Sequence, residues 1–152
     1  MMTIVLSGGG TGGHITPLLA VAHKLKQLKP NCRIIYIGER NGKYSSMLEA
    51  NNDIDEYRTI FAGKFRRYHG ESWLRRVTDI KTLLLNIRDF FYFLIGLVQS
   101  VFIIKKIKPS VVFMKGGFVG VPVGLSSALW GYPIVTHDSD SISGLANRMV
   151  SK

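Results

Sequence analysis

The sequence feature that most constrains the fold is a glycine-rich segment, SGGGTGGHITP, at residues 7–17. It follows a short apolar run, Thr3–Ser7, that predicts a strand. It precedes Pro17–Leu28, where apolar residues recur at helical spacing and Pro17 suits the first turn. A strand, a glycine turn and a helix in this order are typical of the first unit of a parallel α/β sheet.

The rest of the chain alternates in the same way. Further strands are predicted at residues 33–38, 56–61, 111–114 and 134–136, and further helices at 45–50, 73–106, 122–130 and 144–152. The long helix is predicted to end before Pro109, and a break near Asn86 or Gly96 stays open. We therefore predict one domain over residues 1–152, a Rossmann-like doubly wound parallel sheet with right-handed crossovers.

The glycine-rich segment predicts a site for a phosphate group. Backbone N–H groups in such a turn can face an anion with no Cβ in the way, and the following helix adds partial positive charge. The spacing Gly8-x-Gly10-x-x-Gly13 also fits a dinucleotide fingerprint, with Glu39 as the ribose-binding acid. A nicotinamide-dependent oxidoreductase domain is therefore one alternative, and a tight turn that only packs the helix on the strand is another.

His14 is the chemically informative residue of this first loop. It stands at the helix entrance, where a neutral imidazole can accept a proton from a hydroxyl nucleophile. The positive helix end favours the neutral form. The alternative is a capping or hydrogen-bonding role without catalysis.

Two more loops follow predicted strands and should converge on the same sheet edge. In KGGFVGVP, residues 115–122, Lys115 either pairs with phosphate or is solvated, Gly116 and Gly117 allow close backbone approach, and Phe118 either stacks on a sugar or packs. In the HDSDSISGLAN loop, residues 137–147, the candidate site residues are His137, Asp138, Ser139 and Asp140. Helix capping by Asp140 or Ser143 is the alternative, and two carboxylates are too few to predict a metal site.

Positive charge is concentrated in one third of the chain. The net charge is +10, and residues 63–108 hold ten Lys/Arg against three acidic residues. Within this region aromatic and basic residues are mixed, which is typical of an anionic membrane surface; the candidate lipid-binding residues are Phe65, Arg66, Arg67, Trp73, Arg75 and Arg76. The same mixture can bind nucleic acid, but no nucleic-acid-binding motif accompanies it.

The apolar run FFYFLIGLVQSVFII, residues 90–104, is shorter than the roughly 20 residues of a membrane span. We therefore predict no transmembrane helix here, and a buried crossover helix is the alternative to a membrane-facing one. The single cysteine, Cys32, excludes an internal disulfide, and the N-terminus does not resemble a signal peptide. Both features predict a cytoplasmic protein.

Four segments taken together resemble the MurG family, the bacterial N-acetylglucosaminyltransferases of peptidoglycan synthesis. They are GGTGGH at residues 9–14, GKFRRY at 63–68, KPSVVFMKGGFVGVPV at 108–123 and HDSDSISGLANR at 137–148. The resemblance implies the N-terminal, acceptor-side half of a two-domain GT-B enzyme. That enzyme moves N-acetylglucosamine from UDP-N-acetylglucosamine to an undecaprenyl-diphosphate-linked muramoyl peptide, inverts the anomeric centre, and needs no metal or other cofactor.

The resemblance also assigns roles to matching residues. It places Thr11, Gly12 and Gly13 beside a diphosphate and Gly116, Gly117 and Phe118 at the acceptor site, with Asp140 as a substrate contact. His14, His137 and Asp138 are the catalytic candidates. Many members carry Glu where this chain has Asp138, which is one methylene shorter, and Asp140 replaces an amide of some members.

The resemblance covers the acceptor-side half alone, so we expect this chain to bind UDP-N-acetylglucosamine poorly and to turn over little or nothing. The implied location is peripheral, on the cytoplasmic face of the plasma membrane. The partner is a C-terminal donor-binding domain or a separate chain that supplies it. A membrane-recruiting subunit of a split glycosyltransferase is therefore a further alternative.

Overall fold

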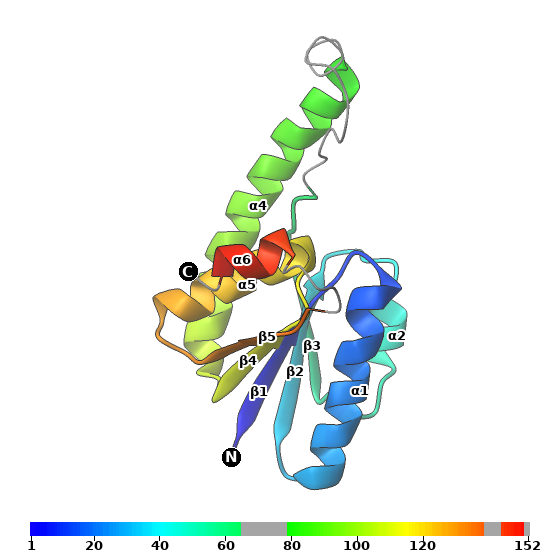
Figure 1. The fold of residues 1–152 in the computed structure, drawn as a ribbon, viewed down its shortest axis with the longest axis vertical. Coiled ribbons are helices and arrows are strands. Elements are labelled where there is room, and N and C mark those ends of the chain that lie inside the picture. The colour runs from blue at the N-terminus through cyan, green and yellow to red at the C-terminus, as the bar shows by residue number, and fades with distance from the viewer. Residues whose placement is uncertain (65–78, 139–143, 151–152) are drawn as a thin grey trace.

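A computed structural model of the protein describes residues 1–64, 79–138 and 144–150, which form a five-stranded parallel sheet between helices (Figure 1). The strands are β1 (Thr3–Ser7), β2 (Arg33–Glu39), β3 (Glu56–Ile60), β4 (Val111–Met114) and β5 (Ile134–Thr136). The helices are α1 (Gly12–Leu28), α2 (Ser45–Glu49), α4 (Ile80–Ile107), α5 (Gly117–Leu129) and α6 (Leu145–Val150). The predicted Rossmann-like fold is confirmed.

The strand order β3-β2-β1-β4-β5 shows that the sheet is wound in both directions from β1. The chain moves outward through β2 and β3, and then α4 carries it back across the sheet to β4 on the other side of β1. The carboxyl ends of β1 and β4 are therefore neighbours at the point where the winding reverses. Ligands of such sheets bind in the crevice at this point.

Alternation along each strand divides the core into two layers. Ile4 and Leu6 of β1 are buried with Leu18 on the side of α1, whereas Val5 is buried with Ile104 and Val119 on the side of α4 and α5. Successive side chains of a strand point to opposite faces, so a sheet covered on both faces needs apolar residues at every position. The central strands β1 and β2, which are buried at nearly every position, carry such apolar runs at Ile4–Leu6 and Ile34–Ile37.

Two helices begin earlier than the sequence predicts. The first begins at Gly12 instead of Pro17, and α5 begins at Gly117 instead of Pro122. Each proline is thus the sixth helical residue, where it withholds one N–H from the carbonyl four positions earlier. Each glycine loop therefore contributes its own last residues to the first turn of a helix.

The long helix α4 is continuous, so the alternative of a break near Asn86 or Gly96 is excluded. Asp79 caps its first turn by accepting a hydrogen bond from the Thr82 N–H at 3.0 Å, and the part of the prediction at residues 73–78 lies outside the described residues. Gly96 does not interrupt the helix. It lets the helix approach the backbone of Phe61, whose carbonyl oxygen would lie 1.8 Å from a Cβ at position 96.

The interpretation of α4 as a buried core helix is also wrong. Only four of its 28 residues are buried, namely Asp89, Gly96, Ser100 and Ile104. Its exposed large apolar residues are Ile80, Leu83, Leu84, Ile87, Phe90, Phe91, Leu94, Ile95, Val98 and Phe102, which we call the α4 apolar face. Figure 1 shows the N-terminal part of α4 extending away from the sheet. By length and composition alone, α4 could cross a membrane.

Candidate functional site

The first two glycine loops touch each other at the carboxyl edge of the sheet. Gly116 and Gly117 both have positive φ angles, of 83° and 77°, which residues with a Cβ rarely adopt. A Cβ on Gly117 would lie 2.8 Å from the Gly9 carbonyl oxygen, and a Cβ on Gly10 would lie 2.5 Å from the Phe118 ring. The glycines are therefore needed where the backbone after β1 and the backbone after β4 pack against each other.

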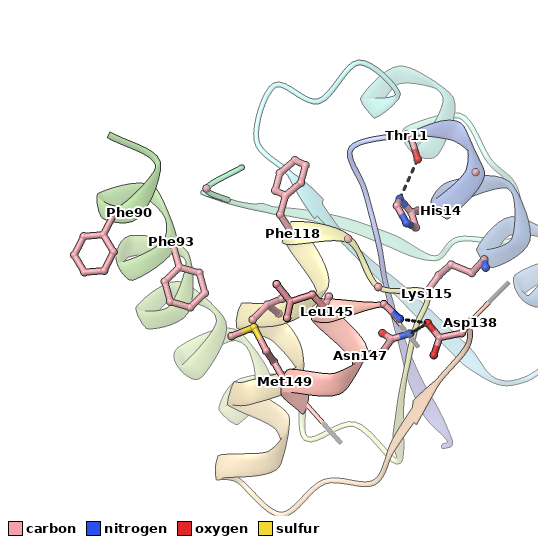
Figure 2. Close-up of a pocket in the computed structure, with 17 residues that line it drawn as sticks. Thr11, His14, Phe90, Phe93, Lys115, Phe118, Asp138, Leu145, Asn147 and Met149 are labelled. Atoms are coloured by element: carbon pink, nitrogen blue, oxygen red, sulfur yellow. Dashed lines mark hydrogen bonds between the residues drawn. The ribbon is translucent and has the colours of Figure 1, made fainter. Parts of the chain in front are cut away.

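A cavity of about 760 Å³ opens beside this contact, a volume within the range of small-molecule sites. It is lined by the helices α1, α4, α5 and α6 and by residues of the loops that follow β1, β3, β4 and β5 (Figure 2). Its lining residues are Thr11, Gly13, His14, Gly63, Phe90, Phe93, Lys115, Gly116, Gly117, Phe118, Val121, Asp138, Gly144, Leu145, Ala146, Asn147 and Met149. The predicted convergence of the three loops on one edge of the sheet is therefore confirmed.

His14 is oriented by the first loop itself. Its Nδ1 lies 2.9 Å from the Thr11 hydroxyl, and its backbone N–H donates to the Thr11 carbonyl at 3.1 Å (Figure 2). A Cβ at Gly117 would lie 3.5 Å from Nδ1, so the imidazole also lies against the second loop. With Nδ1 engaged by Thr11, Nε2 is the ring nitrogen that remains for a ligand in the cavity.

Lys115 is buried, with 5% of its surface exposed, although it follows the last residue of β4. The alternative of a solvated lysine is therefore wrong. A buried ammonium group is stable only beside acceptors or negative charge. Lys115 lines the cavity together with His14, so positive charge and hydrogen-bond donors gather at the glycine-loop end.

Asp138 and Asn147 join the third loop to α6. The Asp138 Oδ1 accepts hydrogen bonds from the Gly144 N–H at 3.0 Å and from the Asn147 amide at 2.8 Å. The same Asn147 nitrogen donates to the His137 carbonyl at 3.2 Å. Asp138 thus contacts the start of the last helix, and the capping alternatives Asp140 and Ser143 lie outside the described residues.

Asn147 is the polar site residue that the sequence did not single out. It is 1% exposed, and its Oδ1 has no hydrogen-bond partner among the described residues. The orientation of the amide is fixed, because its nitrogen faces two hydrogen-bond acceptors, Asp138 and the His137 carbonyl. The oxygen therefore turns to the opposite side, toward Gly116 in the cavity wall.

The remaining sequence-predicted residues are placed as follows. Gly12 lies beside the cavity and faces Tyr44. His137 does not line the cavity, and its ring lies 6.4 Å from that of Phe113. Phe118 packs over Gly10 and against the core, which favours the packing alternative. The lipid-binding candidates Phe65, Arg66, Arg67, Trp73, Arg75 and Arg76, and also Ser139 and Asp140, lie outside the described residues.

Glu39 is engaged within the protein. Burial raises the pKa of its carboxyl group, while Lys64 and a hydrogen bond from the Gly10 N–H act in the opposite direction. A carboxylate that accepts a hydrogen bond from the first glycine loop is not displayed for a ribose. The geometry therefore gives no support to the nicotinamide alternative.

The sequence missed the apolar half of the cavity. Phe90 and Phe93 come from α4, Val121 from α5, and Leu145 and Met149 from α6. The spacings 90/93 and 145/149 place each pair on one face of its helix, which was visible in the sequence. Nothing in the sequence, however, showed that these two faces oppose each other.

Comparison with known proteins supports the family resemblance. Residues 4–152 match the glycosyltransferase family 28 N-terminal domain. One relative, from Clostridium kluyveri, is 43% identical over 99% of this chain. Its name is UDP-N-acetylglucosamine–N-acetylmuramyl-(pentapeptide) pyrophosphoryl-undecaprenol N-acetylglucosamine transferase. A protein of the same name from Lachnospira eligens is 39% identical over 100% of this chain. The chain spans 38% of the length of each of these relatives.

The fold comparison agrees. A crystal structure of MurG from Acinetobacter baumannii superposes with a TM-score of 0.73 at 24% identity, over 99% of this chain and 39% of that one. A UDP-GlcNAc 2-epimerase from Methanocaldococcus jannaschii superposes less closely, with a TM-score of 0.53 at 15% identity. The match over almost the whole chain and the identity to its relatives show that the chain belongs to glycosyltransferase family 28, of which it carries the N-terminal domain.

Proposed function

We propose that this chain is the N-terminal, acceptor-side half of an inverting glycosyltransferase. The complete enzyme moves N-acetylglucosamine from UDP-N-acetylglucosamine to an undecaprenyl-diphosphate-linked muramoyl peptide. The single observation that carries the proposal is the cavity, where glycine loops, His14 and Lys115 gather at one end and apolar side chains at the other. Such a cavity suits an amphiphilic diphosphate, and the names of the relatives contain one, pyrophosphoryl-undecaprenol.

In this reaction an acceptor hydroxyl forms a bond to the anomeric carbon, the bond from that carbon to UDP breaks, and the hydroxyl proton passes to a base. We assign the base role to His14, and the support is that Thr11 engages Nδ1 and leaves Nε2 for the hydroxyl. Asp138 supplies the carboxylate among the residues that line the cavity, and it is held in position by Gly144 and Asn147. His137 contributes its backbone carbonyl, which holds the Asn147 amide.

The test compares donor and acceptor binding by the chain itself. Titration calorimetry should show binding of a short-chain prenyl-diphosphate muramoyl peptide and little heat with UDP-N-acetylglucosamine, because the donor-binding half of the enzyme is a separate domain. Micromolar affinity for the sugar nucleotide without any affinity for the diphosphate acceptor contradicts the assignment to the acceptor side.

Catalysis is tested after the chain is joined to a family 28 C-terminal domain. The variant His14→Ala should lower turnover about 10²- to 10⁴-fold, the usual contribution of a general base. The matched control is His23→Ala, because His23 lies on the same helix but pairs with Asp53 and does not line the cavity. Equal losses in the two variants contradict the role of His14.

We further propose that the protein works at the cytoplasmic face of the plasma membrane as a peripheral protein. The support is the α4 apolar face, together with Lys81 and Arg88 on the exposed side of the same helix. The buried side of α4 is small or polar at Asp89, Gly96 and Ser100, which reverses the usual amphipathic pattern of a surface helix. A helix whose apolar side faces outward suits contact with lipid. The same surface is also consistent with the alternative that the chain is a membrane-recruiting subunit of a split glycosyltransferase.

A further inference from the structure

The cavity is divided into two lobes of different chemistry. The polar lobe is formed by His14, Lys115 and the glycine loops, and the apolar lobe by Phe90, Phe93, Val121, Leu145 and Met149. Figure 2 shows Phe93 directed from α4 toward Leu145 and Met149 of α6. The two lobes are continuous, so one ligand can occupy both.

The apolar lobe is not a closed part of the core. Phe90, Leu145 and Met149 are 49%, 45% and 46% exposed, although each lines the cavity. Large apolar side chains that remain accessible around a hollow are typical of a ligand site. Because α4 supplies one wall, the lobe also adjoins the α4 apolar face.

The polar lobe restricts what kind of apolar ligand can enter. Lys115 is buried there, and the uncapped start of α1 contributes backbone N–H groups, so a negatively charged head group is favoured. A free hydrocarbon or a fatty alcohol lacks this negative charge, whereas a prenyl diphosphate carries it on its head group and presents its apolar chain to the second lobe.

We propose that the apolar lobe binds the isoprene units next to the diphosphate of the acceptor, so that the polyprenyl chain leaves between α4 and α6. The proposal rests on the proposed function for the diphosphate in the polar lobe. It adds the path of the lipid: the first units lie against Phe93 and Met149, and the rest of the chain follows the α4 apolar face into the bilayer. The diphosphate is thereby held at a fixed depth below the membrane surface.

The experiment uses two soluble probes on the whole chain, inorganic pyrophosphate and farnesyl diphosphate below its micelle concentration. Farnesyl diphosphate should bind at least tenfold more tightly than pyrophosphate, because burial of its hydrocarbon adds to the affinity. Phe93→Ala should remove about tenfold of the farnesyl diphosphate affinity and leave pyrophosphate binding unchanged. Met149→Ala, on the opposite wall, provides a second variant with the same expected pattern if Phe93→Ala does not fold.

The matched control is Leu129→Ala, because Leu129 is 68% exposed at the end of α5 and neither lines the cavity nor belongs to the α4 apolar face. This variant should bind both probes as the unaltered chain does. Equal affinity for the two probes, or equal losses in the Leu129 and Phe93 variants, overturns the prenyl path while leaving the diphosphate site intact. If neither probe binds, the proposed function fails together with this inference.

Discussion

The Thr11 hydroxyl lies 2.9 Å from Nδ1 of His14 and can determine which imidazole nitrogen carries the proton. If Nδ1–H donates to Thr11, then Nε2 has the lone pair that a general base needs. If the hydroxyl donates instead, Nε2 carries the proton and His14 can only donate toward the cavity. The role of His14 therefore depends on its neighbour three positions earlier.

We predict that His14 is the Nδ1–H tautomer and that Thr11→Val shifts it toward Nε2–H, because valine cannot accept the hydrogen bond. Thr11→Ser keeps the hydroxyl and should preserve the tautomer. Imidazole ¹⁵N chemical shifts measure this directly on the chain at a pH where the ring is neutral. His23 provides an internal reference, and an Nε2–H signal for His14 in the unaltered chain contradicts the base role.

A second prediction at the residue scale concerns Glu39. Burial raises the pKa of its carboxyl group above the ordinary 4.5, even though Lys64 and the Gly10 N–H oppose the shift. The folded chain therefore holds this proton more tightly than the unfolded chain does. The free energy of unfolding should fall as the pH rises from 4.5 through the pKa of the folded state.

Glu39→Gln should remove this particular loss of stability, while the amide oxygen can still accept from the Gly10 N–H. Urea denaturation of both proteins at several pH values measures the difference, and Glu49→Gln, at an exposed carboxylate of α2, is the control. The difference should grow in favour of the glutamine variant as the pH rises. If the difference in the free energy of unfolding between the two proteins is the same at every pH, the Glu39 proton does not contribute to the pH dependence of stability.

At the scale of elements, close backbone contact fixes α4 against the segment that follows β3. A Cβ at Gly96 would lie 1.8 Å from the Phe61 carbonyl oxygen, and a Cβ at Gly63 would lie 1.8 Å from the Asp89 carbonyl oxygen. The Gln99 side chain also accepts a hydrogen bond from the Phe61 N–H at 2.9 Å. These contacts set the position of Phe90 and Phe93, and thus of one cavity wall.

Gly96→Ala should destabilise the chain by more than about 3 kcal/mol, because the overlap is with rigid backbone. The gain in helix propensity, about 1 kcal/mol, is too small to compensate. The control is Gly131→Ala, where φ is 71° but no atom lies within 4 Å of a Cβ, so only the backbone strain of about 1–2 kcal/mol applies. Urea denaturation distinguishes the two, and equal losses contradict the close contact.

The secondary structure was largely predictable, because strand and helix periodicities differ and because Pro109 ends α4 as expected. The beginnings of α1 and α5 were not, since the preference of proline for a first turn pointed to Pro17 and Pro122. In the folded chain Gly12 and Gly117 begin these helices instead. Local preference was overruled there by the packing of one glycine loop against the other.

At the scale of the whole molecule, the α4 apolar face predicts binding to membranes that carry anionic lipids. The chain should float with vesicles of mixed phosphatidylcholine and phosphatidylglycerol, and the double variant Leu84→Ser/Phe102→Ser should reduce the bound fraction severalfold. Both residues are more than 60% exposed, so the change should leave folding intact. High salt should weaken binding only in part, because apolar burial is not screened.

The control for this measurement is Leu129→Ser, which removes an equally exposed apolar residue from the end of α5 instead of α4. It should float as the unaltered chain does. If the α4 double variant still floats with the vesicles, or if the control loses as much of its bound fraction, then another surface binds the lipid. The basic–aromatic residues 65–76, which lie outside the described part of the chain, would then be the next to test.

The sequence by itself determined the class of fold and the three loops of the site. Periodicity and glycine placement are local properties, and in a parallel sheet loops that follow neighbouring strands must meet at one edge. Only the tertiary structure decided that Lys115 and Asn147 are buried, that His137 does not line the cavity, and that Phe93 faces Met149. The physical reason is that the return of α4 across the sheet and its close approach at Gly96 depend on contacts between residues far apart in the chain, which no local pattern encodes.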